Sequence, residues 1–259
     1  MNLELKNKVA IVGGASKGIG FGIAHILAQE GASVAITARR EPELSAAAER
    51  IRKETGVRVL PIVADARRAE DCRRIVETVK AEFGGLDILI NNDGAPPIGE
   101  IMSFDDAAWT KAVEQNLMYV VRMVREAVPL MKERGGGSIL NITAISAIQP
   151  IPGFALSVAT WSGVIGYAKT LSLEIAPFGI NVNTICPGYI DTTRLRKVFA
   201  AGEEPAEVVQ ARLREEIPVK RIGTVDDIGN LVALLVSSKG SYITGAAIQV
   251  DGGLLRSVR

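Results

Sequence analysis

The chain has 259 residues, and its 30 basic and 29 acidic residues leave a formal net charge of +1. Such a small charge provides no overall field to attract nucleic acid or an anionic membrane, so neither is expected as a partner. With 47% hydrophobic and 23% charged residues, the chain can bury a core that needs no disulfide or metal.

The histidine and cysteine content excludes several kinds of site. The only histidine, His25, lies in an apolar helical pattern, which excludes a Ser-His-Asp hydrolase and argues against a histidine-based zinc site. Cys72 and Cys186 lie far apart without metal-ligand spacing, so both are expected to be small buried apolar residues. We therefore expect no metal site.

The chain shows no segment typical of export or membrane insertion. Its first residues contain no apolar signal region, and no stretch reaches ~18 uncharged apolar residues. We therefore expect a cytoplasmic protein.

Apolar runs alternate with helical patterns along the chain. In chain order we predict a strand at 8–12, a helix at 18–30, a strand at 33–38, a helix at 41–54, a strand at 58–64, a helix at 67–83, a strand at 86–90, a helix at 105–133, a strand at 138–143, a helix at 154–176, a strand at 180–185, a helix at 225–236 and a strand at 247–250. This alternation, with mostly apolar strands, predicts a parallel sheet that is covered by helices on both faces.

No repeat or linker divides the chain, so residues 1–259 are expected to form a single domain. The segment 192–218 breaks the strand-helix alternation and is rich in charged residues and helix formers. Because binding loops are commonly carried by a rigid scaffold, this segment is predicted to be a mobile lid over a substrate.

A glycine-rich turn joins the first predicted strand to the first predicted helix. It reads Gly13-Gly14-Ala15-Ser16-Lys17-Gly18-Ile19-Gly20. Glycines allow a tight turn and a close approach to a pyrophosphate, whose charge is stabilised at the helix N-terminus. The turn therefore predicts a dinucleotide site.

The spacing Gly14-x-x-x-Gly18-x-Gly20 resembles the cofactor loop of short-chain dehydrogenases/reductases. Further segments resemble that family in the same order, namely Asn91-Asn92-Asp93-Gly94, Pro187-Gly188-Tyr189-Ile190-Asp191-Thr192, Tyr242-Ile243-Thr244-Gly245 and Asp251-Gly252-Gly253. The resemblance covers essentially the whole chain and is greatest to the β-ketoacyl-carrier-protein-reductase-like members. It implies a Rossmann-type doubly wound parallel sheet of about seven strands with helices on both faces.

The resemblance also implies which residues hold the cofactor. Asp65 corresponds to the aspartate that meets the adenine in the family. The full set of expected cofactor-binding residues is Gly14, Ser16, Lys17, Gly18, Ile19, Gly20, Arg39, Arg40, Asp65, Ala66, Asn92, Asp93, Gly94, Pro187, Gly188, Ile190 and Thr192.

The charged residues at the end of the second predicted strand indicate whether the chain prefers NADP(H) or NAD(H). A ribose 2′-phosphate is bound by arginine or lysine, whereas a free ribose diol is bound by a carboxylate. The strand ends at Arg39 and Arg40 with no acidic residue, and Lys17 lies in the glycine turn. The sequence therefore favours NADP(H) over NAD(H).

The family's catalytic serine, tyrosine and lysine have no counterparts at the corresponding positions, which are occupied by Ala144, Ser157 and Trp161. Hydride delivery to a carbonyl builds an alkoxide, which needs a nearby proton donor. Of the family's tetrad only Asn116 is retained. Ser157 and, in the loop expected over the nicotinamide, Tyr189 are the other candidate catalytic residues.

Three functions remain open. The chain is either an NADP(H)-dependent oxidoreductase of small carbonyl or alcohol substrates with an atypical active site, a non-redox enzyme such as an isomerase, lyase or cyclase, or a cofactor-binding or regulatory protein without turnover. Family members commonly form tetramers, so the resemblance implies a homo-oligomer, either a tetramer or a dimer. The sequence does not identify the substrate.

Overall fold

The computed structural model describes residues 2–92, 94, 96–200 and 204–257. Its centre is a seven-stranded parallel sheet in the order β3-β2-β1-β4-β5-β6-β7. The strands are β1 (Val9–Val12), β2 (Ser33–Ala38), β3 (Val59–Val63), β4 (Ile88–Asn91), β5 (Gly137–Ile142), β6 (Ile180–Pro187) and β7 (Ala247–Val250). The predicted fold class and all seven predicted strands are confirmed.

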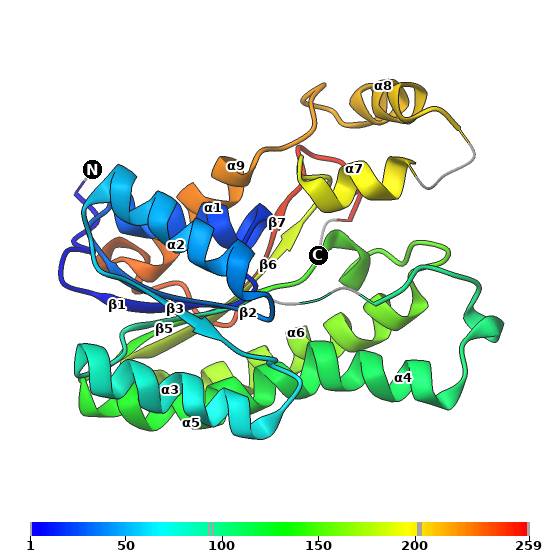
Figure 1. Cartoon of the computed structure of the whole chain (residues 1–259). Coiled ribbons are helices and arrows are strands. Elements are labelled where there is room, and N and C mark those ends of the chain that lie inside the picture. The colour runs from blue at the N-terminus through cyan, green and yellow to red at the C-terminus, as the bar shows by residue number, and fades with distance from the viewer. Residues whose placement is uncertain (1, 93, 95, 201–203, 258–259) are drawn as a thin grey trace.

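Helices cover both faces of the sheet (Figure 1). One layer contains α1 (Gly18–Gln29), α2 (Glu41–Thr55) and α9 (Val225–Val236), and the other contains α3 (Ala69–Phe83), α4 (Asp106–Val113), α5 (Tyr119–Glu133) and α6 (Ala155–Ile175). Strand residues alternate between the two layers, since Ala10 and Val12 pack in one apolar cluster and Val9 and Ile11 in the other. This double burial explains why the strands read as continuous apolar runs.

The long helical region predicted at 105–133 is confirmed, but it is not a regular α-helix in its middle. A π-helical turn, η2 (Glu114–Met118), separates α4 from α5. Asn116 lies in this turn, is 3% exposed, and donates a hydrogen bond of 2.8 Å from Nδ2 to Oγ1 of Thr160 on α6. The widened turn therefore coincides with a polar link between two helices.

The segment 192–218 contains two helices, α7 (Thr193–Ala200) and α8 (Ala206–Glu216). Both lie outside the two helical layers, with α7 close to the ends of β6 and β7 (Figure 1). Among the described residues of this segment, the buried apolar side chains are Phe199, Leu213 and Ile217. The segment is thus helical but weakly anchored to the core.

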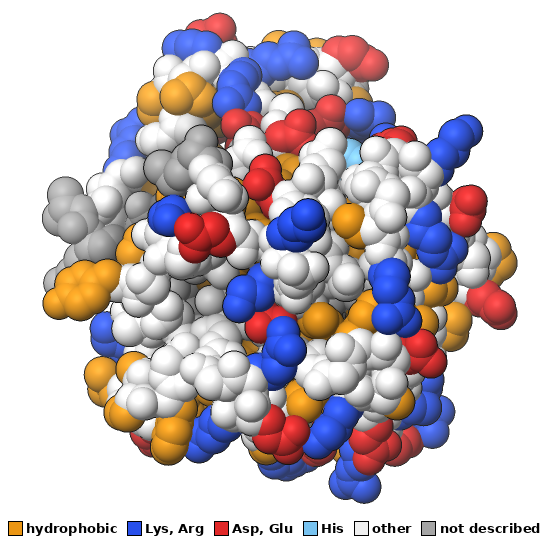
Figure 2. Space-filling model, turned by 90° about the vertical axis from the view of Figure 1, so that its left-hand side faces the viewer, with side chains coloured by type: hydrophobic (Ala, Val, Ile, Leu, Met, Phe, Trp, Pro, Cys, Tyr) orange, Lys and Arg blue, Asp and Glu red, His pale blue; other side chains and the backbone are white. Residues whose placement is uncertain are grey.

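Basic and acidic side chains are interspersed on the face shown in Figure 2. Within the described ranges, no helix is long and apolar enough to cross a membrane, and no group of three or more potential metal ligands occurs. Cys72 and Cys186 are buried and not disulfide-bonded, as predicted.

Candidate functional site

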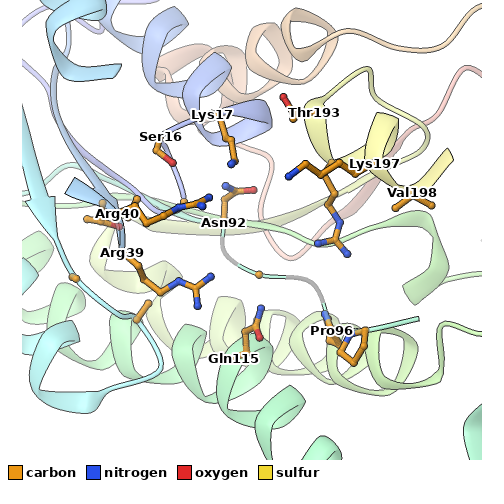
Figure 3. Close-up of a pocket in the computed structure, with 18 of the residues that line it drawn as sticks. Ser16, Lys17, Arg39, Arg40, Asn92, Pro96, Gln115, Thr193, Lys197 and Val198 are labelled. Atoms are coloured by element: carbon orange, nitrogen blue, oxygen red, sulfur yellow. The ribbon is translucent and has the colours of Figure 1, made fainter. Parts of the chain in front are cut away.

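The order in which successive strands are added to the sheet reverses at β1, which pairs with β2 on one side and β4 on the other. In open α/β sheets, ligands bind beyond the carboxyl ends of the strands at such a switch point. A cavity of about 880 Å³ lies here (Figure 3). It is lined by Gly14, Ser16, Lys17, Thr37, Ala38, Arg39, Arg40, Ala64, Ala66, Asn92, Gly94, Pro96, Pro97, Ile98, Gln115, Thr193, Arg194, Lys197 and Val198.

The glycine turn forms one wall of this cavity and has no room for side chains. Gly14 has φ +55°, and a Cβ there would lie 2.5 Å from the Asn92 carbonyl oxygen. A Cβ on Gly20 would lie 2.5 Å from the Gly14 carbonyl oxygen. The first turn of α1, which begins at Gly18, carries no acidic residue. Its positive end is therefore available to an anionic ligand.

Five cationic side chains line the cavity, and no Asp or Glu among the described residues does. Arg39 and Arg40 point into it from the end of β2, Lys17 from the glycine turn, and Lys197 lies on the opposite side (Figure 3). The fifth is Arg194, which α7 also supplies. A cavity with this charge suits a ligand with several phosphates.

Lys17 and Arg40 each have a carboxylate neighbour, which distinguishes them from Arg39. Glu43 lies 3.4 Å from Lys17 Nζ and 3.2 Å from Arg40 Nη2. For Arg39, by contrast, no ion pair or hydrogen bond is found within the described part of the chain. Its charge contributes to the lowered pKa of Asp65. Arg39 is thus the cation at the end of β2 that is most available to a ligand.

Asp65 does not line the cavity, although its neighbours Ala64 and Ala66 do. Its carboxylate is held by the Arg67 side chain, with 2.8 Å between Arg67 Nε and Oδ1. This hydrogen bond is the main reason that the pKa of Asp65 is lowered, against the opposing effect of burial. A contact between Asp65 and an adenine stays a prediction, and such a ligand would compete with Arg67.

A second cavity of about 320 Å³ adjoins the first. The two share Lys17, Asn92, Gly94, Ile98, Thr193, Arg194 and Val198. The remaining lining residues of the second cavity are Gly18, Ile19, Ile142, Thr143, Ala144, Ile145, Ser146, Ile151, Phe154, Ser157, Trp161, Pro187, Gly188, Tyr189, Ile190, Thr192 and Leu195. This lining is mostly apolar, and it includes the three positions at which the trio was expected.

Hydroxyl groups are the main polar groups in this apolar wall. Ser157 is 3% exposed, and its Oγ forms no hydrogen bond within the described residues. Ser146 Oγ is completely buried and also has no partner there. Burial raises the pKa of the Tyr189 phenol above its ordinary value. Apart from Lys17 and Arg194, no described cation lines this cavity.

The structure brings most of the predicted site residues together. Ser157 and Tyr189 line the second cavity, whereas Asn116 lines neither and is buried against α6. Gly20 and Asp65 are the described cofactor-binding candidates that line neither cavity. Asp93 lies outside the described residues. The remaining candidates each line at least one cavity.

No sequence motif pointed to Arg194, Lys197 or Gln115. Arg194 and Lys197 lie one helical turn apart on α7, so they share a face. That spacing was readable, but the position of α7 beside the glycine turn depends on tertiary packing. Gln115 reaches the cavity from the π-helical turn, for which no sequence signal was seen.

Comparisons with known proteins agree with this architecture. The family described as "Enoyl-(Acyl carrier protein) reductase" matches residues 14–255. Human dehydrogenase/reductase SDR family member 4 is 36% identical over 250 residues, which cover 96% of this chain and 88% of that protein. The 3-oxoacyl-[acyl-carrier-protein] reductase FabG of Staphylococcus epidermidis is 36% identical over 249 residues, covering 96% and 99% of the two chains.

Solved structures are also similar over their whole length. L-sorbose reductase from Gluconobacter frateurii, complexed with NADPH and L-sorbose, has a TM-score of 0.96 at 34% identity, with 100% of both chains covered. YwfH, an NADPH-dependent reductase involved in bacilysin biosynthesis, has a TM-score of 0.93 at 28% identity, covering 97% of this chain and 99% of that one.

Proposed function

Because this chain belongs to the short-chain dehydrogenase/reductase family, we propose that it is an NADP(H)-dependent oxidoreductase of a small carbonyl or alcohol substrate. The observation that carries the proposal is the adjacency of the two cavities. One has five cations and no described acid, and the other is apolar and contains free hydroxyl groups. Two similar structures are of NADPH-bound or NADPH-dependent reductases.

The residues present fit this cofactor. Arg39 and Arg40 would hold the 2′-phosphate at the end of β2, as arginines commonly do in NADP(H) sites. Lys17 and the N-terminus of α1 would hold the pyrophosphate, to which the glycine turn allows close approach. When bound, the nicotinamide supplies or accepts the hydride.

The chain's own contribution to the chemistry is atypical. The oxygen of a carbonyl that accepts hydride becomes an alkoxide, which hydrogen-bond donors stabilise. We assign this donor role to Ser157, whose Oγ lies in the second cavity with no competing described partner. Since an unassisted hydroxyl is a weak acid, water would supply the proton. Trp161 contributes an indole where the family has an ammonium.

Asn116 has a positioning role in this proposal. Its hydrogen bond to Thr160 fixes η2 against α6, one residue from Trp161 and three from Ser157. It would therefore orient the helix that carries both residues without contacting the substrate.

The proposal includes the organisation of the whole chain. Residues 1–259 form one nucleotide-binding domain, in which 192–218 closes over the substrate because α7 supplies part of both cavity walls. By resemblance to the family, the protein assembles as a homotetramer or homodimer.

Calorimetric titration with NADPH and NADH tests the proposal, followed by incubation of the NADPH complex with candidate ketones. We expect tighter binding of NADPH and slow oxidation of the cofactor. A protein that binds neither nucleotide would contradict the proposal. Conversion of a substrate without any change in cofactor absorbance would instead identify a non-redox enzyme.

A further inference from the structure

Arg194 is the second residue of α7 and lines both cavities. Within the described ranges it has no ion pair or hydrogen bond, whereas Arg196, two residues further, binds Asp191 at 2.8 and 2.9 Å. Arg194 is exposed to solvent. Nearby protein nevertheless lowers the pKa of its guanidinium by burial. It is therefore a partly desolvated cation that faces a cavity.

The cofactor does not require this cation. A 2′-phosphate carries up to about two negative charges and a pyrophosphate linkage about two more. Lys17, Arg39, Arg40 and Lys197 supply four positive charges around the first cavity, and the N-terminus of α1 adds about half a charge. Glu43, which neighbours Lys17 and Arg40, offsets part of this positive charge, but the remainder is still close to the negative charge of the cofactor without Arg194.

The second cavity, by contrast, leaves Arg194 facing an apolar wall. Ile145, Phe154 and Trp161 line that wall, and the other cation, Lys17, already has Glu43 at 3.4 Å. Pairing with an anion is stronger beside apolar surroundings than in open water, because the charges are less well screened there. A guanidinium binds a carboxylate through two parallel hydrogen bonds, which makes it selective for that group.

We propose that Arg194 binds a carboxylate of the substrate, so that the protein acts on an aliphatic oxo acid or the corresponding hydroxy acid. This inference rests on the proposed function and gives its substrate class. The carboxylate pairs with Arg194, the carbonyl oxygen accepts a hydrogen bond from Ser157, and the carbon chain packs against Phe154 and Trp161. A neutral ketone of the same shape lacks the first contact.

The test compares each of 2-, 4- and 5-oxohexanoate with its neutral primary amide, by calorimetry on free and NADPH-saturated protein. The three acids place the carboxylate at different distances from the ketone. The variant is Arg194→Met, with Arg194→Lys as a charge-retaining form. Arg196→Met is the matched control, because its side chain is 68% exposed, pairs with Asp191 and lines neither cavity.

We expect at least one acid to bind about 10- to 100-fold more tightly than its amide, which is the range for a charge-assisted hydrogen-bonded pair. Arg194→Met should remove this preference and Arg194→Lys should retain part of it. Arg196→Met should change it less than about twofold, as for a surface ion pair. In Arg194→Met, NADPH affinity should stay within about threefold, because the other four cations suffice.

Two results would overturn the inference. One is that no acid binds better than its amide to the wild-type protein in either form. The other is that Arg194→Met weakens NADPH binding more than about tenfold and leaves the preference for acid over amide unchanged. The anion bound by Arg194 would then be a cofactor phosphate. If the wild-type protein does not bind NADPH at all, the proposed function itself is contradicted. This result distinguishes failure of the proposed function from failure of the inference about Arg194.

Discussion

The side-chain amide of Asn92 donates a hydrogen bond of 3.0 Å to the carbonyl oxygen of Gly13, which joins the end of β4 to the glycine turn after β1. The same amide nitrogen would lie 2.6 Å from a Cβ on Gly20. Backbone and amide thus close the space around the turn from two sides.

Gly20→Ala should therefore weaken NADPH binding at least about tenfold, since a misplaced turn loses more than one charge-assisted hydrogen bond. Titration calorimetry measures this directly. Gly166→Ala is the control, because a Cβ there meets nothing within 4 Å and alanine favours a helix. Unchanged NADPH affinity in Gly20→Ala would show that the turn does not contact the nucleotide.

Cofactor preference should depend on Arg39. We expect NADPH to bind more tightly than NADH to the wild-type protein, and Arg39→Asp to narrow or reverse the difference by placing a carboxylate beside the 2′ position. Arg73→Asp, on the exposed face of α3, makes the same charge change away from both cavities. Equal wild-type affinities for the two nucleotides would refute the role of Arg39.

The proposed atypical trio of Ala144, Ser157 and Trp161 predicts weak reductase activity. General acid catalysis contributes roughly 10²–10⁴-fold and an oxyanion donor a similar factor, so NADPH-dependent reduction of generic ketones should be near the detection limit. The triple change Ala144→Ser, Ser157→Tyr, Trp161→Lys should raise it substantially. Single changes should do much less, because the three groups act as a unit.

Burial makes stability the main concern for that variant. Trp161 is 9% exposed, so a lysine there places a charge at a largely buried position. Circular dichroism and NADPH titration should accompany the kinetics. Efficient ketone reduction by the wild-type protein that survives Ser157→Ala would place the chemistry on other residues.

The segment 192–218 should be the most mobile internal part of the protein without ligand. Few of its side chains are buried, and α7 and α8 lie outside the main layers. Hydrogen exchange should be faster there than in β4 or β5, and NADPH should slow it in α7. Slower exchange in this segment than in the strands would contradict the prediction.

Acid should remove a stabilising contact at the start of α9. Asp227 accepts hydrogen bonds from Arg221 at 2.7 and 2.8 Å and from the Thr224 backbone at 2.7 Å, and the Arg221 guanidinium is the main cause of its lowered pKa. A carboxylate with a lowered pKa stabilises the fold at neutral pH, and this contribution is lost as pH falls.

Asp227→Asn should therefore lower the free energy of unfolding by about 1 kcal/mol at neutral pH, the usual size of a helix cap. The difference should shrink below about pH 4, where Asp227 begins to take up a proton in the unfolded chain while its lowered pKa keeps it charged in the folded protein to lower pH. Urea denaturation at several pH values measures it, with the exposed Asp226→Asn as control. A difference that is constant with pH would exclude this electrostatic cause.

The sheet could be predicted because its signal is local. Each strand is a short apolar run with a turn at its end, and burial on both faces produces that run. The glycine turn and the arginines after β2 were readable for the same reason. The position of the Asp65 side chain could not be predicted, because its pairing with Arg67 two residues away depends on the conformation of the intervening backbone.

The parts that could not be predicted depend on contacts between distant elements. Asn116 was expected among the catalytic residues, and its burial against Thr160 arises from the packing of η2 on α6. Arg194 belonged to a segment predicted as a lid, but only the placement of α7 shows that its side chain borders both cavities.

The π-helical turn at Glu114–Met118 has a consequence for how such a site can be inherited. A π turn is an α-helix with one residue inserted. Deleting a single codon there would close it into regular helix and rotate α4 by about 100° relative to α5. Gln115 could then no longer line the cavity while Asn116 contacts α6. The loss of one residue, with no substitution, would thus change the lining of the cavity in a descendant protein.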